Sequence, residues 1–147
     1  MEPYVKSTDY CVHYEIAEPG VEVYNNLEDC WYETSAGKNV ILTGTVGEQW
    51  VTSEEKLYNT YECYDNGEAW PRGDGSIVWM RPAEGQEEVA TSWGDVLTAN
   101  LPYNSQGEPV PHGDGDMVAC ADAGGYPDEN DCWVVNGAVF ANTYLPA

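Results

Sequence analysis

Two internal similarities constrain the fold of this chain more than any other feature. The dipeptide Trp-Val occurs at residues 50–51 and again at 133–134, and in both places a Thr-Tyr pair follows nine residues after the Val. Leu57 and Phe140 hold matching positions, seven residues after each tryptophan. This matched spacing predicts two related units within the chain.

A second pair of segments repeats at an offset of forty residues: PRGDGSIV at 71–78 and PHGDGDMV at 111–118. Their Gly-Asp-Gly steps supply residues that tolerate positive φ, as a tight turn requires. Each unit then reads as turn, strand, turn, strand and short helix. The pattern predicts an α+β fold of small antiparallel β-sheets with short packed helices, in two units at 1–64 and 65–147, the second with inserted acidic loops.

Local signals place the expected elements. Thr52 followed by Glu55 is a capping box, which predicts a helix beginning there, and Asn136 is the expected N-cap of the second helix. The expected strands are 10–16, 21–24, 40–43, 48–51, 77–81, 88–91 and 117–121, and 101–112 reads as a surface loop. The aromatic side chains expected in the two cores are Trp50, Tyr61, Trp133 and Tyr144.

The composition excludes several classes of protein. The chain holds 26 acidic and 5 basic residues, for a net charge of −21, yet 42% of it is hydrophobic and 12% aromatic, so we expect it to fold. Five scattered basic residues form no basic patch, which disfavours direct binding to nucleic acid or to an anionic membrane. No apolar run is long enough to span a bilayer, and the first ten residues lack the pattern of a secretory signal.

The cysteines give no zinc or redox motif, because none of the five lies in a C-x-x-C pair. We expect reduced thiols in a cytoplasm. Cys11 and His13 are a possible metal pair on one strand face, although a half-buried strand is the favoured interpretation. A nucleophilic pair of His112 with Cys120 or Cys132 is a weaker alternative. The sequence therefore predicts neither catalytic residues nor a metal or cofactor.

The turn, strand, Trp-Val strand and terminal helix resemble the PGDYG family, a small module of bacterial and phage proteins. The matching segments are 36–62 (AGKNVILTGTVGEQWVTSEEKLYNTYE) and 111–144, which we interpret as two diverged copies. The signature Pro-Gly-Asp is Ala-Gly-Lys at 36–38, and the second copy carries an insertion near 124–131. The resemblance implies a phage or prophage origin and a compact α+β fold, and it implies no catalytic residues.

The acidity has no terminal tail to carry it, since residues 1–63 have a net charge of −9 and residues 64–147 one of −12. We expect it on the folded surface, where self-repulsion costs stability. The favoured function is an acidic inhibitor, not an enzyme, that mimics nucleic acid and binds a basic nucleic-acid-binding host protein (anti-CRISPR or anti-restriction) in the host cytoplasm. Alternatives are a phage virion or accessory structural protein, a haloadapted protein, and a calcium-binding loop at 114–131. The oligomeric state stays open.

Under the inhibitor hypothesis, carboxylates near the turns and the first helix replace phosphates opposite Lys and Arg of the partner. For each of them a solvated surface acid is the plainer interpretation. The predicted partner-binding residues are Glu54, Glu55, Glu62, Asp65, Glu84, Glu87, Glu88, Asp114, Asp116, Asp128, Glu129 and Asp131.

Overall fold

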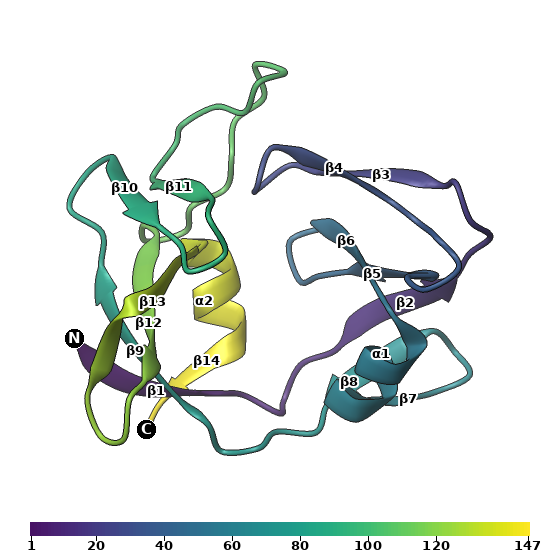
Figure 1. Cartoon of the computed structure of the whole chain (residues 1–147), viewed down its shortest axis with the longest axis horizontal. Coiled ribbons are helices and arrows are strands. Elements are labelled where there is room, and N and C mark those ends of the chain that lie inside the picture. Colours follow the sequence, from purple (N-terminus) through teal and green to yellow (C-terminus); the bar gives the residue numbers. More distant parts are fainter. The chain divides into compact units, whose positions relative to one another are not determined.

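The computed structural model describes all residues from 1 to 147 and divides the chain into two compact units (Figure 1). We call residues 8–73 the continuous unit, and residues 1–7 with 74–147 the discontinuous unit. These limits differ from the predicted 1–64 and 65–147. The reason is strand pairing: β1 (Glu2–Lys6) pairs with β9 (Ile77–Pro82), far along the chain, and not with a strand of its own half.

The continuous unit contains a five-stranded sheet in the order β6-β5-β2-β8-β7 and a separate two-stranded sheet, β3-β4. Helix α1 (Glu54–Thr60) connects β6 to β7, the two edge strands. The strands are β2 (Val12–Ile16), β3 (Glu22–Asn25), β4 (Cys30–Glu33), β5 (Val40–Thr43), β6 (Gln49–Thr52), β7 (Tyr61–Cys63) and β8 (Glu68–Pro71).

The discontinuous unit contains a five-stranded sheet in the order β13-β12-β9-β1-β14 and the two-stranded sheet β10-β11. Helix α2 (Gly137–Thr143) again connects the two edge strands, here β13 and β14. Besides β1 and β9, the strands are β10 (Glu87–Ala90), β11 (Val96–Ala99), β12 (Met117–Asp122), β13 (Pro127–Val135) and β14 (Tyr144–Pro146).

All strand pairs are antiparallel, which confirms the predicted class of small antiparallel sheets with short helices. The first helix starts one residue later than predicted. Ser53, not Thr52, is its N-cap, because the Ser53 hydroxyl accepts the backbone N–H of Lys56 at 3.1 Å. Asn136 caps α2 as expected, accepting the N–H groups of Ala138 and Val139.

Each unit has its own hydrophobic core. In the continuous unit Leu57 of α1 is fully buried against Val40 and Leu42 of β5. Tyr61 is buried in the same cluster, and Trp50 packs against it half-buried. The prediction for these two aromatic residues is therefore confirmed, with Trp50 at the edge of the cluster rather than inside it.

The core of the discontinuous unit is built around Met80, Met117, Ala119 and Val135. Trp133 and Tyr144 pack against this cluster as predicted, both half-buried. Three aromatic rings, those of Tyr4, Phe140 and Tyr144, also lie together: the ring centroids of Tyr4 and Phe140 are 5.0 Å apart in an edge-to-face arrangement, and Tyr144 stacks on Phe140 at 6.1 Å.

Candidate partner-binding surface

The twelve predicted partner-binding acids are divided between the units. Four belong to the continuous unit, on α1, β7 and the turn after β7, and all four are exposed: Glu54, Glu55, Glu62 and Asp65. Eight belong to the discontinuous unit: Glu84, Glu87, Glu88, Asp114, Asp116, Asp128, Glu129 and Asp131. Each of the two groups of acids therefore belongs to its own unit.

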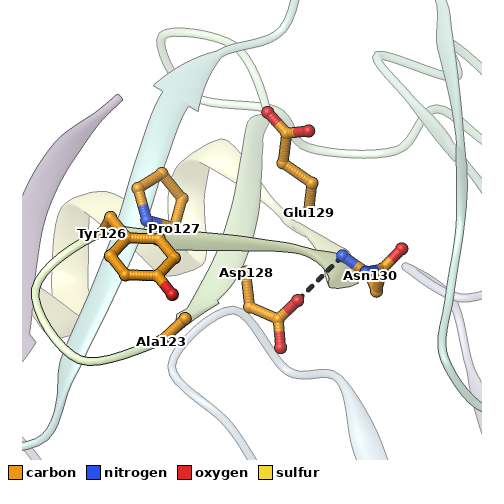
Figure 2. A pocket seen from close by; sticks show the side chains of 6 residues that line it. All are labelled: Ala123, Tyr126, Pro127, Asp128, Glu129 and Asn130. Atoms are coloured by element: carbon orange, nitrogen blue, oxygen red, sulfur yellow. Dashed lines mark hydrogen bonds between the residues drawn. The ribbon is translucent and has the colours of Figure 1, made fainter.

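The turn between β12 and β13 borders an open hollow of about 630 Å³ (Figure 2). Tyr126, Asp128 and Glu129 line it, and the Tyr126 side chain is 62% exposed. Asp128 accepts the backbone N–H of Asn130 at 3.0 Å, which fixes its carboxylate beside the hollow. Residues 128–131 were expected in an inserted acidic loop, but they lie within β13, in an irregular part of the hairpin between the pairs Asp122–Pro127 and Cys120–Cys132.

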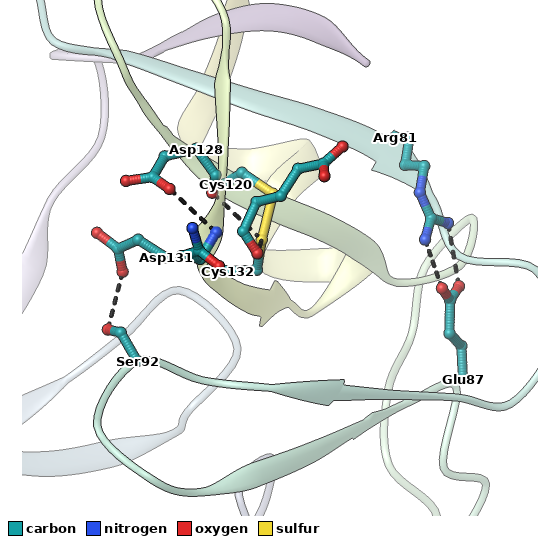
Figure 3. The surroundings of a disulfide bond; sticks show 9 residues. Arg81, Glu87, Ser92, Cys120, Asp128, Asp131 and Cys132 are labelled. Carbon is teal, nitrogen blue, oxygen red and sulfur yellow. Dashed lines mark hydrogen bonds and ion pairs between the residues drawn. A yellow bond between two sulfur atoms is a disulfide. The ribbon is translucent and has the colours of Figure 1, made fainter.

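The hairpin β10–β11 packs against β13 and brings further carboxylates to the same region (Figure 3). Ser92, in the turn of the hairpin, donates to Asp131 of β13 at 3.0 Å. The neighbouring Trp93 is 58% exposed, and its indole N–H donates to Asp95 at 2.8 Å. Glu88 is exposed because the alternate residue Val89 points into the unit.

We call this surface the acidic face. Its members share one unit and come from the β10–β11 hairpin, from the turn before β13 or from β13 itself. Each carries a carboxylate or an aromatic ring, exposed in all of them except Asp128 and Asp131, which are half-buried. The members are Glu88, Trp93, Asp95, Tyr126, Asp128, Glu129 and Asp131. Four of its five carboxylates were predicted from the sequence. Asp95 and the two aromatic residues were not, because the exposure of the rings depends on the turns that hold them.

Glu87 lies beside the acidic face but is already neutralised. Arg81 of β9 forms a two-pronged ion pair with it, Nη1 to Oε2 at 3.0 Å and Nη2 to Oε1 (Figure 3). The Arg81 guanidinium lowers the pKa of the Glu87 carboxyl, and the backbone N–H of Glu84 adds to the effect. Glu87 is therefore poorly placed to pair with a partner's cation, contrary to its predicted role.

The ion pair predicts the pH behaviour of Glu87. Because its pKa is lowered in the folded state, the pair stabilises the fold above the ordinary glutamate pKa and loses this contribution as pH falls through the lowered value. We expect Arg81→Ala to raise the Glu87 pKa toward its ordinary value of 4.5, measured by carboxyl-carbon NMR titration. An unchanged Glu87 pKa in this variant would show that the guanidinium is not the cause.

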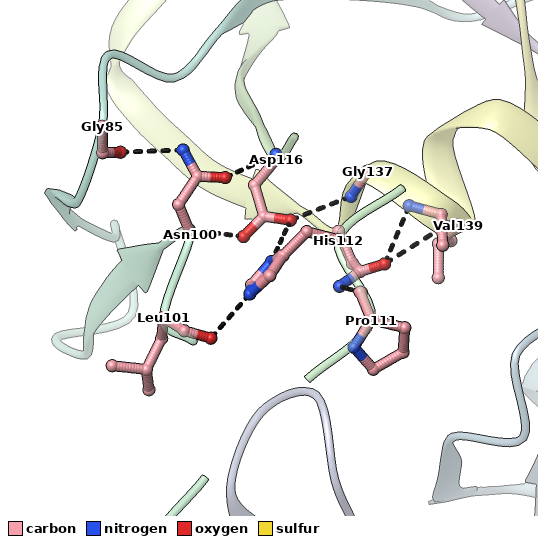
Figure 4. Close-up of polar contacts among 10 residues, drawn as sticks. Gly85, Asn100, Leu101, Pro111, His112, Asp116, Gly137 and Val139 are labelled. Atoms are coloured by element: carbon pink, nitrogen blue, oxygen red, sulfur yellow. Dashed lines mark hydrogen bonds and ion pairs between the residues drawn. The ribbon is translucent and has the colours of Figure 1, made fainter. Parts of the chain in front are cut away.

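Asp116 is the clearest correction to the predicted set, because it is buried, with 5% of its surface exposed (Figure 4). Its carboxylate accepts the backbone N–H of Asn100 at 2.6 Å, His112 Nδ1 at 2.9 Å and the backbone N–H of Gly137 at 2.9 Å. These bonds tie the loop before β12 to the first residue of α2. Asp116 therefore holds the fold together and has no free oxygen surface for a partner.

The catalytic and metal alternatives find no support in the geometry. Cys120 and Cys132 form a disulfide, and both ring nitrogens of His112 are hydrogen-bonded, to Asp116 and to the carbonyl of Leu101 at 2.6 Å. This removes the considered Cys–His nucleophile. No three His, Cys, Asp or Glu side chains are grouped as metal ligands anywhere in the chain, the 114–131 segment included.

The disulfide corrects the expectation of reduced thiols for two of the five cysteines. Cys120 on β12 and Cys132 on β13 lie directly opposite each other, with Cα atoms 4.2 Å apart, as in a close antiparallel pair. Cys11, Cys30 and Cys63 are free and half-buried. Burial raises the pKa of the Cys11 thiol, which makes its thiolate scarce at neutral pH.

Reduction of the disulfide should lower the free energy of unfolding of the discontinuous unit by about 3 kcal/mol, because a loop of this length is freed in the unfolded chain. The continuous unit has no disulfide and should be unaffected. Amide hydrogen exchange with and without reductant measures both effects in one sample. A Cys120→Ala/Cys132→Ala variant controls for the reductant, and loss of protection in residues 8–73 would contradict the prediction.

Comparison with protein family models, with curated proteins and with solved structures finds no match for this chain. None of its helices combines the length and the apolar character needed to cross a bilayer.

Proposed function

We propose that this chain is an acidic binding protein that inhibits a host nucleic-acid enzyme by occupying its basic nucleic-acid-binding surface. The acidic face is the observation that carries the proposal. It gathers carboxylates from β10–β11 and β13, while Arg81, the one basic residue beside it, is already paired with Glu87. The carboxylates of the acidic face are not ion-paired, so Lys and Arg side chains of a nucleic-acid channel would bind them as they bind phosphates.

Charge density shows why a gathered face matters. The folded chain exposes 8330 Å², so its net charge of −21 corresponds to about one charge per 400 Å². A DNA duplex presents about one charge per 110 Å². The average surface is therefore too dilute to imitate a duplex, and mimicry depends on a local concentration of acids such as the acidic face.

The exposed aromatic residues fit the same partner. Trp93 and Tyr126 stand among the carboxylates of the acidic face, and aromatic rings attract the guanidinium of Arg. Rings of this kind commonly supply the strong contacts of protein interfaces. We propose that these two residues add contact energy to an electrostatically steered encounter.

The resemblance of 36–62 and 111–144 to the PGDYG family supports a phage-type origin, and hence action against a host restriction or CRISPR enzyme in the host cytoplasm. A cytoplasm keeps most thiols reduced, so the proposal requires binding that persists without the Cys120–Cys132 disulfide. Binding lost on reduction would place the activity elsewhere.

The first experiment is a pull-down from bacterial lysate with the tagged chain at low and high salt. We expect a basic nucleic-acid enzyme at low salt, released by added duplex DNA and by high salt because surface charges are screened. Recovery of capsid or tail proteins in a salt-insensitive complex would instead support the alternative of a phage structural protein.

Charge reversal locates the contact. Glu88→Lys with Glu129→Lys changes two exposed members of the acidic face and should weaken binding about tenfold, since attraction becomes repulsion at two positions. The matched control, Glu15→Lys with Glu18→Lys, makes the same change of net charge on exposed residues of the continuous unit. Equal weakening by both pairs, measured by titration calorimetry, would show that net charge and not the acidic face determines binding.

We also propose that the two units are copies of one module. The support is their corresponding order of elements: a five-stranded antiparallel sheet, a separate two-stranded hairpin, and a seven-residue helix between the edge strands. The repeated Trp-Val pairs lie on corresponding strands, β6 and β13, and the repeated Thr-Tyr pairs end the corresponding helices.

A further inference from the structure

Strand β1 occupies the same position in the sheet of the discontinuous unit as strand β8 occupies in the sheet of the continuous unit. The sheet orders β6-β5-β2-β8-β7 and β13-β12-β9-β1-β14 match strand for strand, with α1 and α2 in the same connection. In each sheet, one strand lies between two others. One neighbour is the strand that comes first in the consecutive stretch of the unit, β2 or β9, and the other is the strand after the helix, β7 or β14. The strand between them is β8 in one unit and β1 in the other.

The match extends to individual residues. Ala69 of β8 lies opposite Val12 on one side and Cys63 on the other. Tyr4 of β1 lies opposite Val78 and Pro146. The next backbone bonds also correspond, because the Arg72 N–H donates to the Thr60 carbonyl at 3.0 Å and the Ser7 N–H donates to the Thr143 carbonyl at 2.7 Å. The two strands thus fill equivalent slots in equivalent register.

Along the chain, however, β1 precedes β2 and β8 precedes β9, and the five-residue connections 7–11 and 72–76 have equal length. A copy of the module in sequence order is therefore 2–63 or 68–146. Resting on the proposed relation of the two units, we infer that the copies have exchanged their first strands, so that each copy completes the sheet of the other. Neither copy contains a whole sheet by itself.

Core packing explains why the exchanged arrangement is favoured. Three core positions correspond between the units. In the continuous unit they hold Ala69 on β8, Tyr14 on β2 and Leu42 on β5. In the discontinuous unit they hold Tyr4 on β1, Met80 on β9 and Ala119 on β12. At these three positions each core holds one tyrosine, Tyr14 on the second strand in the continuous unit and Tyr4 on the first strand in the discontinuous unit.

Returning each first strand to its own copy would upset both cores. The continuous unit would then hold Tyr4 beside Tyr14 and Leu42, and overpacking of this kind costs about 1–3 kcal/mol. The discontinuous unit would receive Ala69 in the place of Tyr4 and would lose the ring contact of Tyr4 with Phe140, which leaves a cavity. The sequence of each first strand therefore fits the core of the other copy.

A competition between disulfides in the full chain tests the exchange. In a Cys11→Ser/Cys30→Ser background, Tyr4→Cys with Pro146→Cys gives residue 4 two possible partners: residue 146 if the strands are exchanged, or the native Cys63 if they are not. Positions 4 and 146 are opposed in β1 and β14, so mild oxidation followed by peptide mass mapping reads the choice. We expect the 4–146 bridge to exceed the 4–63 bridge by about tenfold or more.

The reciprocal variant covers a failure of the first to fold, since Tyr4 belongs to the core. Ala69→Cys with Pro146→Cys in the same background lets residue 69 choose between Cys63, expected from exchange, and residue 146. Bridges 4–63 or 69–146 would overturn the inference, and so would a 4–146 bridge joining two chains on a non-reducing gel. None of these outcomes depends on whether the acidic face binds a host enzyme.

Discussion

Deletion of residues 1–7 should unfold residues 74–147 and leave residues 8–73 folded. The deletion removes β1, which lies between β9 and β14, so both neighbours lose their hydrogen-bonded partner in the middle of a five-stranded sheet. It also removes Tyr4 from its contact with Phe140. An unpaired strand edge with buried apolar neighbours costs more than a small unit can offset, because folded domains are stable by only about 5–15 kcal/mol.

Hydrogen exchange resolved along the chain measures the effect of this deletion, with the full chain as the control. Amide protection should vanish across β9, β12 and α2 and persist in β5 and α1. Loss of protection in residues 8–73, with 74–147 intact, would contradict the account, because it would mean that β1 completes the continuous unit instead.

Gly137→Ala should strongly destabilise the discontinuous unit. Gly137 is buried at the start of α2, and a Cβ atom there would collide with the backbone carbonyl oxygens of His112 and Gly115. Backbone cannot move aside as a flexible side chain does. The collision would also displace the Gly137 N–H from Asp116, leaving a buried carboxylate short of one donor.

We expect this substitution to lower the free energy of unfolding of the discontinuous unit by about 3 kcal/mol or more, as overpacking and a lost buried hydrogen bond combine. Chemical denaturation followed by tryptophan fluorescence measures it. Gly37→Ala is the matched control, since a Cβ at Gly37 meets nothing and its φ is not in the left-handed region. A destabilisation no larger than that of the control would show that the backbone of the turn before β12 shifts to make room for the added Cβ atom.

The sequence predicted those elements whose signals are local. The strand at 40–43 agrees in both bounds with β5, and Asn136 caps α2, because an apolar run and a capping side chain each act within a few residues. Strands β1, β4, β7, β8, β11 and β14 were not predicted. Each has three to five residues, and its conformation depends on partners elsewhere in the chain, which single-sequence periodicity does not report.

The candidate surface shows the same difference between what local sequence reveals and what long-range contacts determine. The acidic residues of the surface were visible in the sequence, but their environments were not: Asp116 is buried and Glu87 is ion-paired because of contacts with residues 100, 137 and 81. The polar run 128–131 gave no strand signal, yet it lies within β13, because Pro127 on one side of it pairs with Asp122 and Cys132 on the other side pairs with Cys120. The disulfide had no such local signal, because Cys120 lies four residues before the Gly124-Gly125 turn and Cys132 seven residues after it, and a register shift in the hairpin brings the two cysteines opposite each other.

The most direct test of the central claim is a competition titration with the captured enzyme and fluorescently labelled duplex DNA. We expect the added chain to release the DNA completely, the release to weaken as salt rises, and Glu88→Lys with Glu129→Lys to weaken it about tenfold. A stable complex of chain, enzyme and DNA together would contradict this expectation, because a protein that occupies the phosphate site cannot share that site with a duplex.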